Sequence, residues 1–235
     1  MKIIIANWKM YLNGKDAVAL AKKLAPLRQG SAGQAKNKII LAPSFTALPA
    51  VAKVAGKLDL AGQNMSWQGY GAYTGEICGE ELKLLGCEYI ILGHSERRKY
   101  CKETDEMIGQ KVKYAQKLGL TPVLCVGETE EEKKAGKTLE VVKRQLKIAL
   151  DGVDTKKLIV AYEPVWAIGT GNPENPENAN MVQGEIKKQA GNAPVLYGGS
   201  VDSKNFAGFL AQKNIDGLLV GGASTKWDEF SKIIK

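Results

Sequence analysis

The sequence is poor in the residues that bind metals or form disulfides. Its 235 residues include one histidine, His94, and four cysteines, none of which form a C-x-x-C pair. A single imidazole and thiols at these spacings favour neither a metal site nor a disulfide framework. We therefore expect no bound metal, and reduced thiols of the kind found in the cytoplasm. The cysteines are Cys78, Cys87, Cys101 and Cys125.

Long hydrophobic runs and dense patches of charge are also missing. No apolar run reaches the ~20 residues that a membrane-spanning helix needs, and the N-terminal segment MKIIIANWKM lacks the cleavage site of a signal peptide. The net charge is +8, but the lysines are spread in singles and pairs such as Lys22-Lys23, beside acidic residues. We therefore expect neither a membrane nor a nucleic acid as partner, while the positive excess would attract a small anionic substrate.

Eight short apolar runs, rich in β-branched residues, recur along the chain and indicate strands. Several show little polar alternation, which is typical of strands buried on both faces in a parallel sheet. The runs are Ile3–Ala6, Lys38–Ala42, Leu58–Ala61, Tyr89–Leu92, Thr121–Val126, Leu158–Tyr162, Pro194–Tyr197 and Gly217–Val220. Helix-like stretches between them include Asp16–Leu27, Asp105–Leu118, Glu130–Leu150 and Glu177–Ala190.

A strand followed by a helix, repeated about eight times without a linker, predicts a closed (β/α)8 barrel. A chain of 235 residues suits one such α/β domain, and we place its bounds at residues 1–235. A doubly wound open sheet is the alternative, although it usually has fewer strands and no G-x-G-x-x-G follows the first run.

In such barrels the functional groups follow the carboxyl ends of the strands, and several reactive residues stand there. Glu163 follows the sixth run in AYEPVWAIGTG, and a carboxylate partly withdrawn from water is a stronger base. His94 lies in ILGHSERR, before a short helix whose N-terminus disfavours imidazolium and keeps the ring neutral. Lys9 follows the first run and could place an ammonium beside an oxyanion. Each residue alone could equally be an ordinary loop side chain.

Gly-Gly pairs follow the seventh and eighth runs, in YGGS and VGGAS. Glycines there let backbone N–H groups approach an anion, and these two loops often bind phosphate in this architecture. A base, a neutral imidazole, a cation and a phosphate cradle on one rim predict proton abstraction beside a carbonyl in a phosphorylated substrate. Such a reaction needs neither a metal nor an organic cofactor.

Eight motifs carry a resemblance to a known family: NWKM, AGQN, GAYTGE, LGHSERR, CVGE, AYEPVWAIGTG, YGGSV and DGLLVGGAS. They occur in the family's order between Ile3 and Ile234, and through them the chain resembles the triosephosphate isomerases. The resemblance implies the TIM barrel fold and the interconversion of dihydroxyacetone phosphate and D-glyceraldehyde 3-phosphate through an enediolate. It also implies a place in glycolysis and gluconeogenesis, and no cofactor.

The resemblance assigns a role to each site residue. Glu163 would take a proton from carbon and return it to the neighbouring carbon, while neutral His94 would donate to the enediolate oxygens. Lys9 would supply positive charge, Asn7 would orient the substrate and Glu96 would join the network of the site. Backbone N–H groups would bind the phosphate, and they belong to Gly169, Ser200, Gly221 and Gly222.

The resemblance also implies a lid over the site. A stiff hinge at Pro164-Val165-Trp166 would precede the mobile tip, and Ile168 and Leu219 would pack around the Glu163 carboxylate. Closure would exclude water and keep the enediolate from losing its phosphate to form methylglyoxal. The lid residues are Pro164, Val165, Trp166, Ala167, Ile168, Gly169, Thr170 and Gly171.

A homodimer is the last implication of the resemblance. In the family, the loop that corresponds to Gln63–Glu76 reaches into the neighbouring subunit. Thr74 would then lie near Asn7 and Lys9 of that subunit, so that each site is completed by its neighbour.

Three places depart from the family's pattern. The second lid hinge reads Asn172-Pro173-Glu174, where basic or small residues are common, and its proline predicts a stiffer hinge. Pro194 and Asn214 stand where many members carry a salt-bridged Arg and Asp, so both partners are absent together and no buried charge is stranded. Cys101 and Lys102 stand where an aromatic residue and a glycine are common, which changes the packing beside the His94 loop.

Two other functions suit the same barrel. One is a different phosphosugar isomerase or aldolase; an aldolase would need a lysine inside a later strand or several histidines, and the chain has neither. The other is a binding or scaffold protein that keeps only the phosphate site. Loss of Glu163, His94 or Lys9 would favour it, and all three are present.

Overall fold

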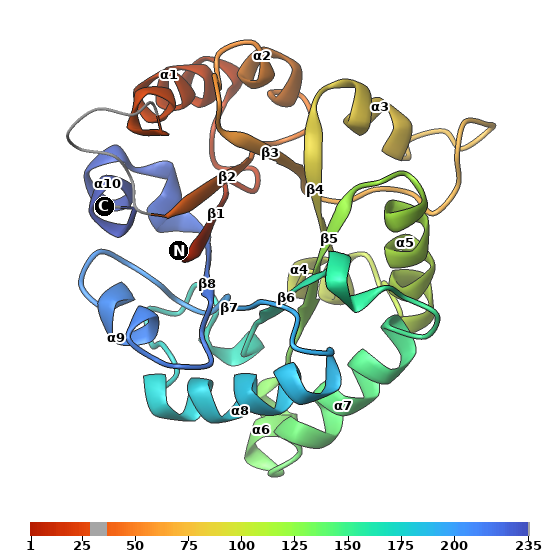
Figure 1. Ribbon diagram of the computed structural model, residues 1–235, viewed down its shortest axis with the longest axis vertical. Helices are drawn as coiled ribbons and strands as arrows, with labels where there is room; N and C mark the ends of the chain where they lie inside the picture. The colour runs from red at the N-terminus through yellow and green to blue at the C-terminus, as the bar shows by residue number, and fades with distance from the viewer. Residues whose placement is uncertain (29–36, 235) are drawn as a thin grey trace.

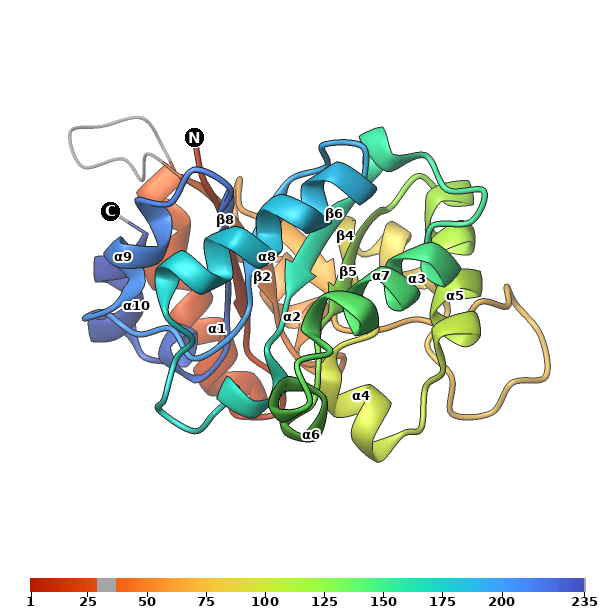
Figure 2. The ribbon, with the colours of Figure 1, turned by 90° about the horizontal axis from the view of Figure 1, so that it is seen from below.

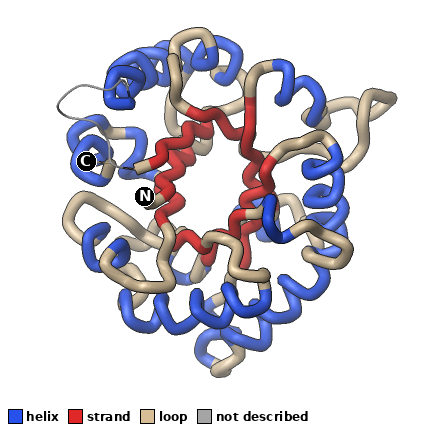
Figure 3. The backbone as a smooth tube through the Cα atoms, in the orientation of Figure 1, coloured by secondary structure: helices blue, strands red, loops and turns tan. Residues whose placement is uncertain are grey.

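The computed structural model describes residues 1–28 and 37–234. Eight parallel strands form a closed barrel in sequence order, and the pairing of the first with the last completes it. The strands are β1 (Ile3–Asn7), β2 (Lys38–Ala42), β3 (Asp59–Gly62), β4 (Cys87–Leu92), β5 (Thr121–Val126), β6 (Ile159–Tyr162), β7 (Val195–Tyr197) and β8 (Gly217–Val220). They form a central ring with the helices outside it (Figure 3). The predicted (β/α)8 barrel is confirmed, and the open sheet is excluded.

The helices follow the strands around the outside of the barrel (Figure 1). They are α1 (Gly14–Leu24), α2 (Leu48–Ala52), α3 (Gly79–Leu84), α4 (Ser95–Tyr100), α5 (Asp105–Lys117), α6 (Glu130–Lys134), α7 (Thr138–Ala149), α8 (Pro176–Gln189), α9 (Phe206–Leu210) and α10 (Trp227–Ile233). Short 3-10 turns are η1 (Ala25–Arg28), η2 (Thr155–Lys157), η3 (Val165–Ala167) and η4 (Gly222–Thr225). Within the described ranges, no helix has both the length and the apolar character needed to cross a bilayer.

The predicted helix over Glu130–Leu150 is wrong in one respect, because two helices occupy that stretch. Thr129 begins α6 with a capping box that includes Glu132. Gly136 then takes a φ of 70°, in the left-handed region that favours glycine and ends a helix. The chain therefore turns between α6 and α7. Figure 2 shows α6 and α4 at the end of the barrel opposite the N-terminus.

Two hydrophobic layers bury both faces of the strands. The inner layer fills the barrel with alternate strand residues: Ile5, Ile40, Ala42, Ala61, Tyr89, Ile91, Val123, Cys125, Ile159, Ala161, Leu196 and Leu219. The residues between them, such as Ile4, Ile39 and Ile90, face the helices in the outer layer. This double burial explains why the runs lack polar alternation. The interior is packed, so chemistry is left to the rims.

The structure shows the backbone conformation or the contacts at two of the departures from the family's pattern, Lys102 and Asn214. Lys102 has a φ of 56°, in the left-handed region that costs a non-glycine residue conformational energy. A glycine would adopt this conformation without that cost. Asn214 instead bonds Asn180 twice, through its backbone N–H at 2.9 Å and its side-chain amide at 3.1 Å. This neutral pair leaves no unpaired charge at that position.

Replacing Lys102 with glycine should increase the free energy of unfolding by about 0.5–1 kcal/mol, because relief of the left-handed strain outweighs glycine's greater unfolded-state freedom. Urea denaturation measures this change. The control is Lys99→Gly within α4, which should lower the same free energy by about 1 kcal/mol. A loss of stability in both variants would contradict the strain at Lys102.

Candidate active site

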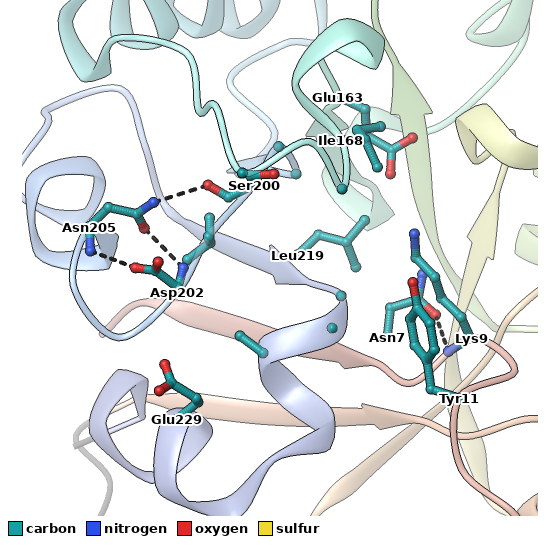
Figure 4. A pocket seen from close by; sticks show the side chains of 18 of the residues that line it. Asn7, Lys9, Tyr11, Glu163, Ile168, Ser200, Asp202, Asn205, Leu219 and Glu229 are labelled. Carbon is teal, nitrogen blue, oxygen red and sulfur yellow. Dashed lines mark hydrogen bonds between the residues drawn. The ribbon is translucent and has the colours of Figure 1, made fainter.

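The site residues from five different strand ends meet in one pocket of about 560 Å³ at the carboxyl-terminal rim (Figure 4). Those in its wall are Asn7, Lys9, His94, Glu163, Gly169, Ser200, Gly221 and Gly222. Glu96 lies outside this wall, behind Lys9, and lines a neighbouring hollow. Ile168 and Leu219 also line the pocket, and Ile168 lies beside Glu163 in Figure 4.

Glu163 is a buried carboxylate whose oxygens lie beside nitrogen atoms of Ser95 and His94. It directly follows β6 and is only 2% exposed. Its Oε2 accepts a hydrogen bond from the backbone N–H of Ser95 at 2.9 Å, and its Oε1 lies 3.1 Å from Nε2 of His94. Gly198 leaves space for the side chain, since a Cβ atom there would lie 2.9 Å from Cγ of Glu163. The Ser95 N–H and the adjacent imidazole therefore flank the two carboxylate oxygens.

His94 caps the N-terminus of α4 and is 7% exposed. Its Nδ1 accepts the backbone N–H of Glu96 at 3.2 Å. A ring nitrogen that accepts a hydrogen bond carries no proton, so this bond assigns the neutral ring with its proton on Nε2. Nε2 lies 3.1 Å from Oε1 of Glu163, and His94 therefore presents a neutral donor nitrogen to the pocket.

Arg98 supports the loop that carries His94 through hydrogen bonds to two backbone carbonyls. Its Nε donates to the carbonyl of Gly93 at 2.9 Å, and its Nη2 donates to the carbonyl of Cys125 at 3.2 Å. Arg98 therefore ties the end of β4 to the end of β5. Burial raises the pKa of the Cys125 thiol well above its ordinary value, and the nearby Glu163 charge adds to this effect. Cys125 is thus an uncharged neighbour of the carboxylate.

Lys9 takes an uncommon backbone conformation, with a φ of 47° just after β1. Its N–H donates to Oδ1 of Asn7 at 3.2 Å, and its carbonyl accepts from the Gln63 side chain at 3.0 Å. Its Nζ bonds Oε1 of Glu96 at 2.5 Å. These contacts hold the ammonium at the rim, and Gln63, named above only as the start of the dimer loop, supports it there.

The lid segment is stiff first and glycine-rich afterwards. Pro164 precedes η3, and the carbonyl of Ala167 accepts a 2.6 Å bond from the Ser200 hydroxyl across the pocket. Gly169 and Gly171 then have φ values of 70° and 77°, which favour glycine. The stretch thus joins a rigid turn beside Glu163 to a tip whose backbone conformation is rarely adopted by residues other than glycine.

Glu128, two residues after β5, bonds the first hinge and was given no role by the sequence. It is fully buried and accepts from Nε1 of Trp166 at 2.9 Å and from the Tyr162 hydroxyl at 3.1 Å. Burial raises the pKa of the Glu128 carboxyl, and burial together with Glu128 raises the pKa of Tyr162. Trp166 follows Glu128 by 38 residues, so no local pattern could have revealed the contact.

Metal-ligating side chains do not gather at this site. In residues 1–28 and 37–234, no group of three or more His, Cys, Asp or Glu side chains is arranged to hold an ion. The four cysteines are free thiols. The pocket wall presents a carboxylate, an imidazole, an ammonium and glycine-rich backbone.

A family model described as triosephosphate isomerase matches residues 2–235. The chain belongs to the triosephosphate isomerase family. A triosephosphate isomerase of Dictyoglomus thermophilum is 44% identical over 248 residues, covering 100% of this chain and 98% of the relative. One from Synechococcus sp. (strain JA-2-3B'a(2-13)) is 45% identical over 99% of this chain and 95% of the relative. One from Caldanaerobacter subterraneus subsp. tengcongensis is 44% identical over 99% and 98%. Family membership makes the chain an isomerase.

Gly198→Ala should lower the isomerase kcat by up to about 10²-fold, because the added methyl would push the Glu163 side chain aside by a fraction of an ångström or more. A steady-state isomerase assay measures the loss. Gly208→Ala in α9 is the matched control, since its nearest non-bonded atom would be 3.5 Å away. Equal activity in the two variants would contradict the need for space beside Glu163.

Proposed function

We propose that the chain interconverts dihydroxyacetone phosphate and D-glyceraldehyde 3-phosphate through an enediolate, with Glu163 as the base. The observation that carries the proposal is the buried Glu163 carboxylate facing the Nε2–H of neutral His94 in a pocket walled by glycine-rich loops. The names of the relatives support the substrate. In this function residues 1–235 would act as one catalytic domain in the cytoplasm, in glycolysis and gluconeogenesis.

The proton transfer follows from the partners of Glu163. The carboxylate would leave the Ser95 N–H and turn to the substrate carbon beside the carbonyl, from which it takes a proton. The substrate oxygens would replace Oε1 of Glu163 opposite the His94 Nε2–H. The same carboxyl then returns the proton to the neighbouring carbon. A neutral donor suits this cycle because it can pass a proton between the two enediolate oxygens.

Lys9, Asn7 and Glu96 would manage the charge of the intermediate. The Lys9 side chain is 16% exposed, so water screens its ammonium only in part. This cation would stabilise the enediolate oxygens, and the Asn7 amide, 4% exposed, would orient them. Glu96 would hold Nζ of Lys9 in place between turnovers, through the ion pair that already exists.

The phosphate would lie against the backbone of four residues on the far wall. Gly222 begins the η4 turn, and Gly221 lies beside Lys9, where an added Cβ would be 3.4 Å from the lysine Cε. Small residues there let N–H groups approach an anion closely. The phosphate-binding residues would be Gly169, Ser200, Gly221 and Gly222.

The lid would then close over this phosphate. Pro164–Gly171 joins the base to the phosphate wall, since Glu163 precedes it and the Ser200 hydroxyl bonds the carbonyl of Ala167. Closure would exclude water, strengthen the electrostatic contacts and protect the enediolate from losing phosphate. No metal or organic cofactor takes part in the proposed reaction.

Glu163→Gln should lower kcat at least about 10³-fold in a coupled assay with glyceraldehyde 3-phosphate, because an amide cannot accept the carbon-bound proton. Glu163→Asp should lose on the order of 10²–10³, since it withdraws the carboxylate by one methylene. Thermal melts of all three proteins check that the variants are folded. If the glutamine variant kept the parent's kcat, Glu163 would not be the base.

We also propose a homodimer, on the evidence of one protruding loop and one hollow. The loop between β3 and α3 projects from the barrel (Figure 1) and exposes Tyr70 by 67%. A hollow of about 490 Å³ lies beside Asn7 and Lys9. Its lining includes Met10, which is 93% exposed. A second subunit's loop, including its exposed Thr74, would cover this apolar surface.

Thr74→Arg should shift the chain from dimer towards monomer. A long cation would enter a mainly apolar hollow whose wall already includes the cations Lys9 and Arg97. Sedimentation velocity over a range of concentrations measures the shift. Gln189→Arg, at the exposed end of α8, adds the same charge elsewhere and should sediment like the parent. An unchanged profile for Thr74→Arg would argue against this interface.

A further inference from the structure

Gln145 is a buried polar residue on the inner face of α7, outside the active-site pocket. Its side chain is 4% exposed, and the other buried residues of that helix are apolar: Val141, Val142, Leu146 and Ala149. The buried face of a helix usually carries apolar side chains. A buried amide costs free energy unless its donor and its acceptor are both paired. The partners of Gln145 therefore indicate what an amide does at this position.

Both partners of the amide belong to one residue, Gly127, which directly follows β5. The N–H of Gly127 donates to Oε1 of Gln145 at 2.8 Å, and Nε2 of Gln145 donates to the carbonyl oxygen of Gly127 at 3.1 Å. The side chain thus satisfies both backbone groups that a strand residue offers to a neighbouring strand. Through this pair of bonds, α7 holds the main chain at the end of β5.

Gly127 in turn packs against the main chain of the proposed base. A Cβ atom at position 127 would lie 1.8 Å from the carbonyl oxygen of Glu163 and 3.3 Å from its Cα, so the two main chains meet with no side chain between them. The N–H of Glu163 donates to the carbonyl oxygen of Val126, the residue before Gly127, at 2.8 Å. The end of β5 therefore locates the Cα atom from which the Glu163 carboxylate extends.

The contacts of Glu163 thus form two sets with different fates during the proposed reaction. Its carboxylate oxygens lie beside Ser95 and His94, and they would exchange those neighbours for the substrate. Its main chain rests on Gly127, and no step of the proposed reaction alters that contact. While the carboxylate turns to the substrate, the main-chain contacts still determine where the side chain starts.

We propose that Gln145 is a positioning residue of the isomerase: by holding both backbone groups of Gly127, it fixes the surface on which the main chain of Glu163 rests. This statement rests on the proposed role of Glu163 as the base. Neither Gln145 nor Gly127 is among the described residues that form the pocket wall. Loss of the amide should therefore misplace the base and leave phosphate binding intact, and a misplacement of about 1 Å can lower a rate by about 10²-fold.

The decisive variant is Gln145→Met, which keeps the length of the side chain and removes both hydrogen bonds. It should lower kcat on the order of tenfold, and it should leave KM and the inhibition constant of inorganic phosphate within about twofold of the parent's values. Gln145→Asn keeps the amide but withdraws it by one methylene, so it cannot reach both groups of Gly127 at once. Its kcat should lie between those of the parent and Gln145→Met.

Val142→Ala on the same helix is the matched control for damage to the core. Val142 is 1% exposed and belongs to the buried face of α7, so its truncation should lower the melting temperature. Because Val142 offers no hydrogen bond to Gly127, kcat should match the parent's. A kcat that falls in Val142→Ala as much as in Gln145→Met would reduce the effect to stability and overturn the proposal.

The placement of the base can be measured without turnover, because His94 is the single histidine of the chain. Labelling with ¹⁵N-histidine gives the NMR spectrum of one imidazole, whose Nε2 lies 3.1 Å from Oε1 of Glu163. Gln145→Met should shift the Nε2 signal, since the carboxylate beside it moves, and Val142→Ala should leave the signal unchanged. An unshifted Nε2 signal in folded Gln145→Met would overturn the proposal.

A second label shows whether Gly127 has lost its hydrogen bond. The dipeptide Val-Gly occurs only at Val126-Gly127 and Val220-Gly221. Valine labelled with ¹³C at its carbonyl, together with ¹⁵N-glycine, therefore marks the N–H groups of these glycines alone. The Gly127 signal should move in Gln145→Met, while that of Gly221, on the proposed phosphate wall, stays fixed. Val220→Ile removes the Gly221 signal and so assigns both.

These signals separate failure of this proposal from failure of the proposed function. If the parent does not isomerise triose phosphates, but Gln145→Met moves both the Gly127 and the His94 signals, the positioning contact stands and the proposed reaction does not. If the parent isomerises them, and Gln145→Met moves the Gly127 signal while kcat and the His94 signal match the parent's, Gln145 serves stability alone and the proposal is overturned.

Discussion

The pairing of β1 with β8 closes the barrel, and the whole rim depends on it. The N–H of Ile3 donates to the carbonyl of Asp216 at 3.0 Å, and the register then places Ile3 opposite Gly217. Only glycine suits that contact, since a Cβ atom at position 217 would lie 1.8 Å from the carbonyl oxygen of Ile3. Closure brings Lys9, near the start of the chain, beside Gly221, near its end. A cation and a glycine-rich loop become neighbours because the two terminal strands can pair this closely.

Three buried carboxylates around the lid differ in their partners, and the partners indicate what each can do. Glu163 accepts the Ser95 N–H and lies beside Nε2 of His94 inside the pocket, where its remaining lone pairs face the space for a substrate. Glu128 accepts from an indole N–H and a phenol and lies outside the pocket wall, which suits a fixed structural contact rather than proton transfer at the substrate. Glu174 meets the ammonium of Lys133 and is bound in place by it. Similar burial thus serves three purposes, because the neighbouring charges and donors differ.

Local patterns in the sequence predicted the strands and the residues that gather at the rim, because a doubly buried strand and a strand-ending loop are both encoded by neighbouring residues. The predicted strands agree with the observed ones to within one or two residues at each end. The join of α6 to α7 was predicted wrongly because Gly136 lies in a polar stretch where no buried periodicity marks a helix end. The Lys133–Glu174 contact spans 41 residues and could not be predicted, since neither residue has a distinctive neighbourhood in the chain. Roles that depend on such long-range partners emerge only from the folded arrangement.

The contacts of Glu174 and Trp166 add to the stiffness inferred for the second hinge from Pro173. Pro173 is exposed, and its ring limits the backbone of the second hinge. The next residue, Glu174, sends its carboxylate inward to Lys133, so backbone restriction and ion pairing act on successive residues. The first hinge begins directly after Glu163, and Trp166 within it bonds Glu128. Motion of the lid is therefore coupled at one end to the base and at both ends to the segment after β5. Movement of either hinge would change the contacts to Glu128 or Lys133, and the first hinge directly follows the proposed base.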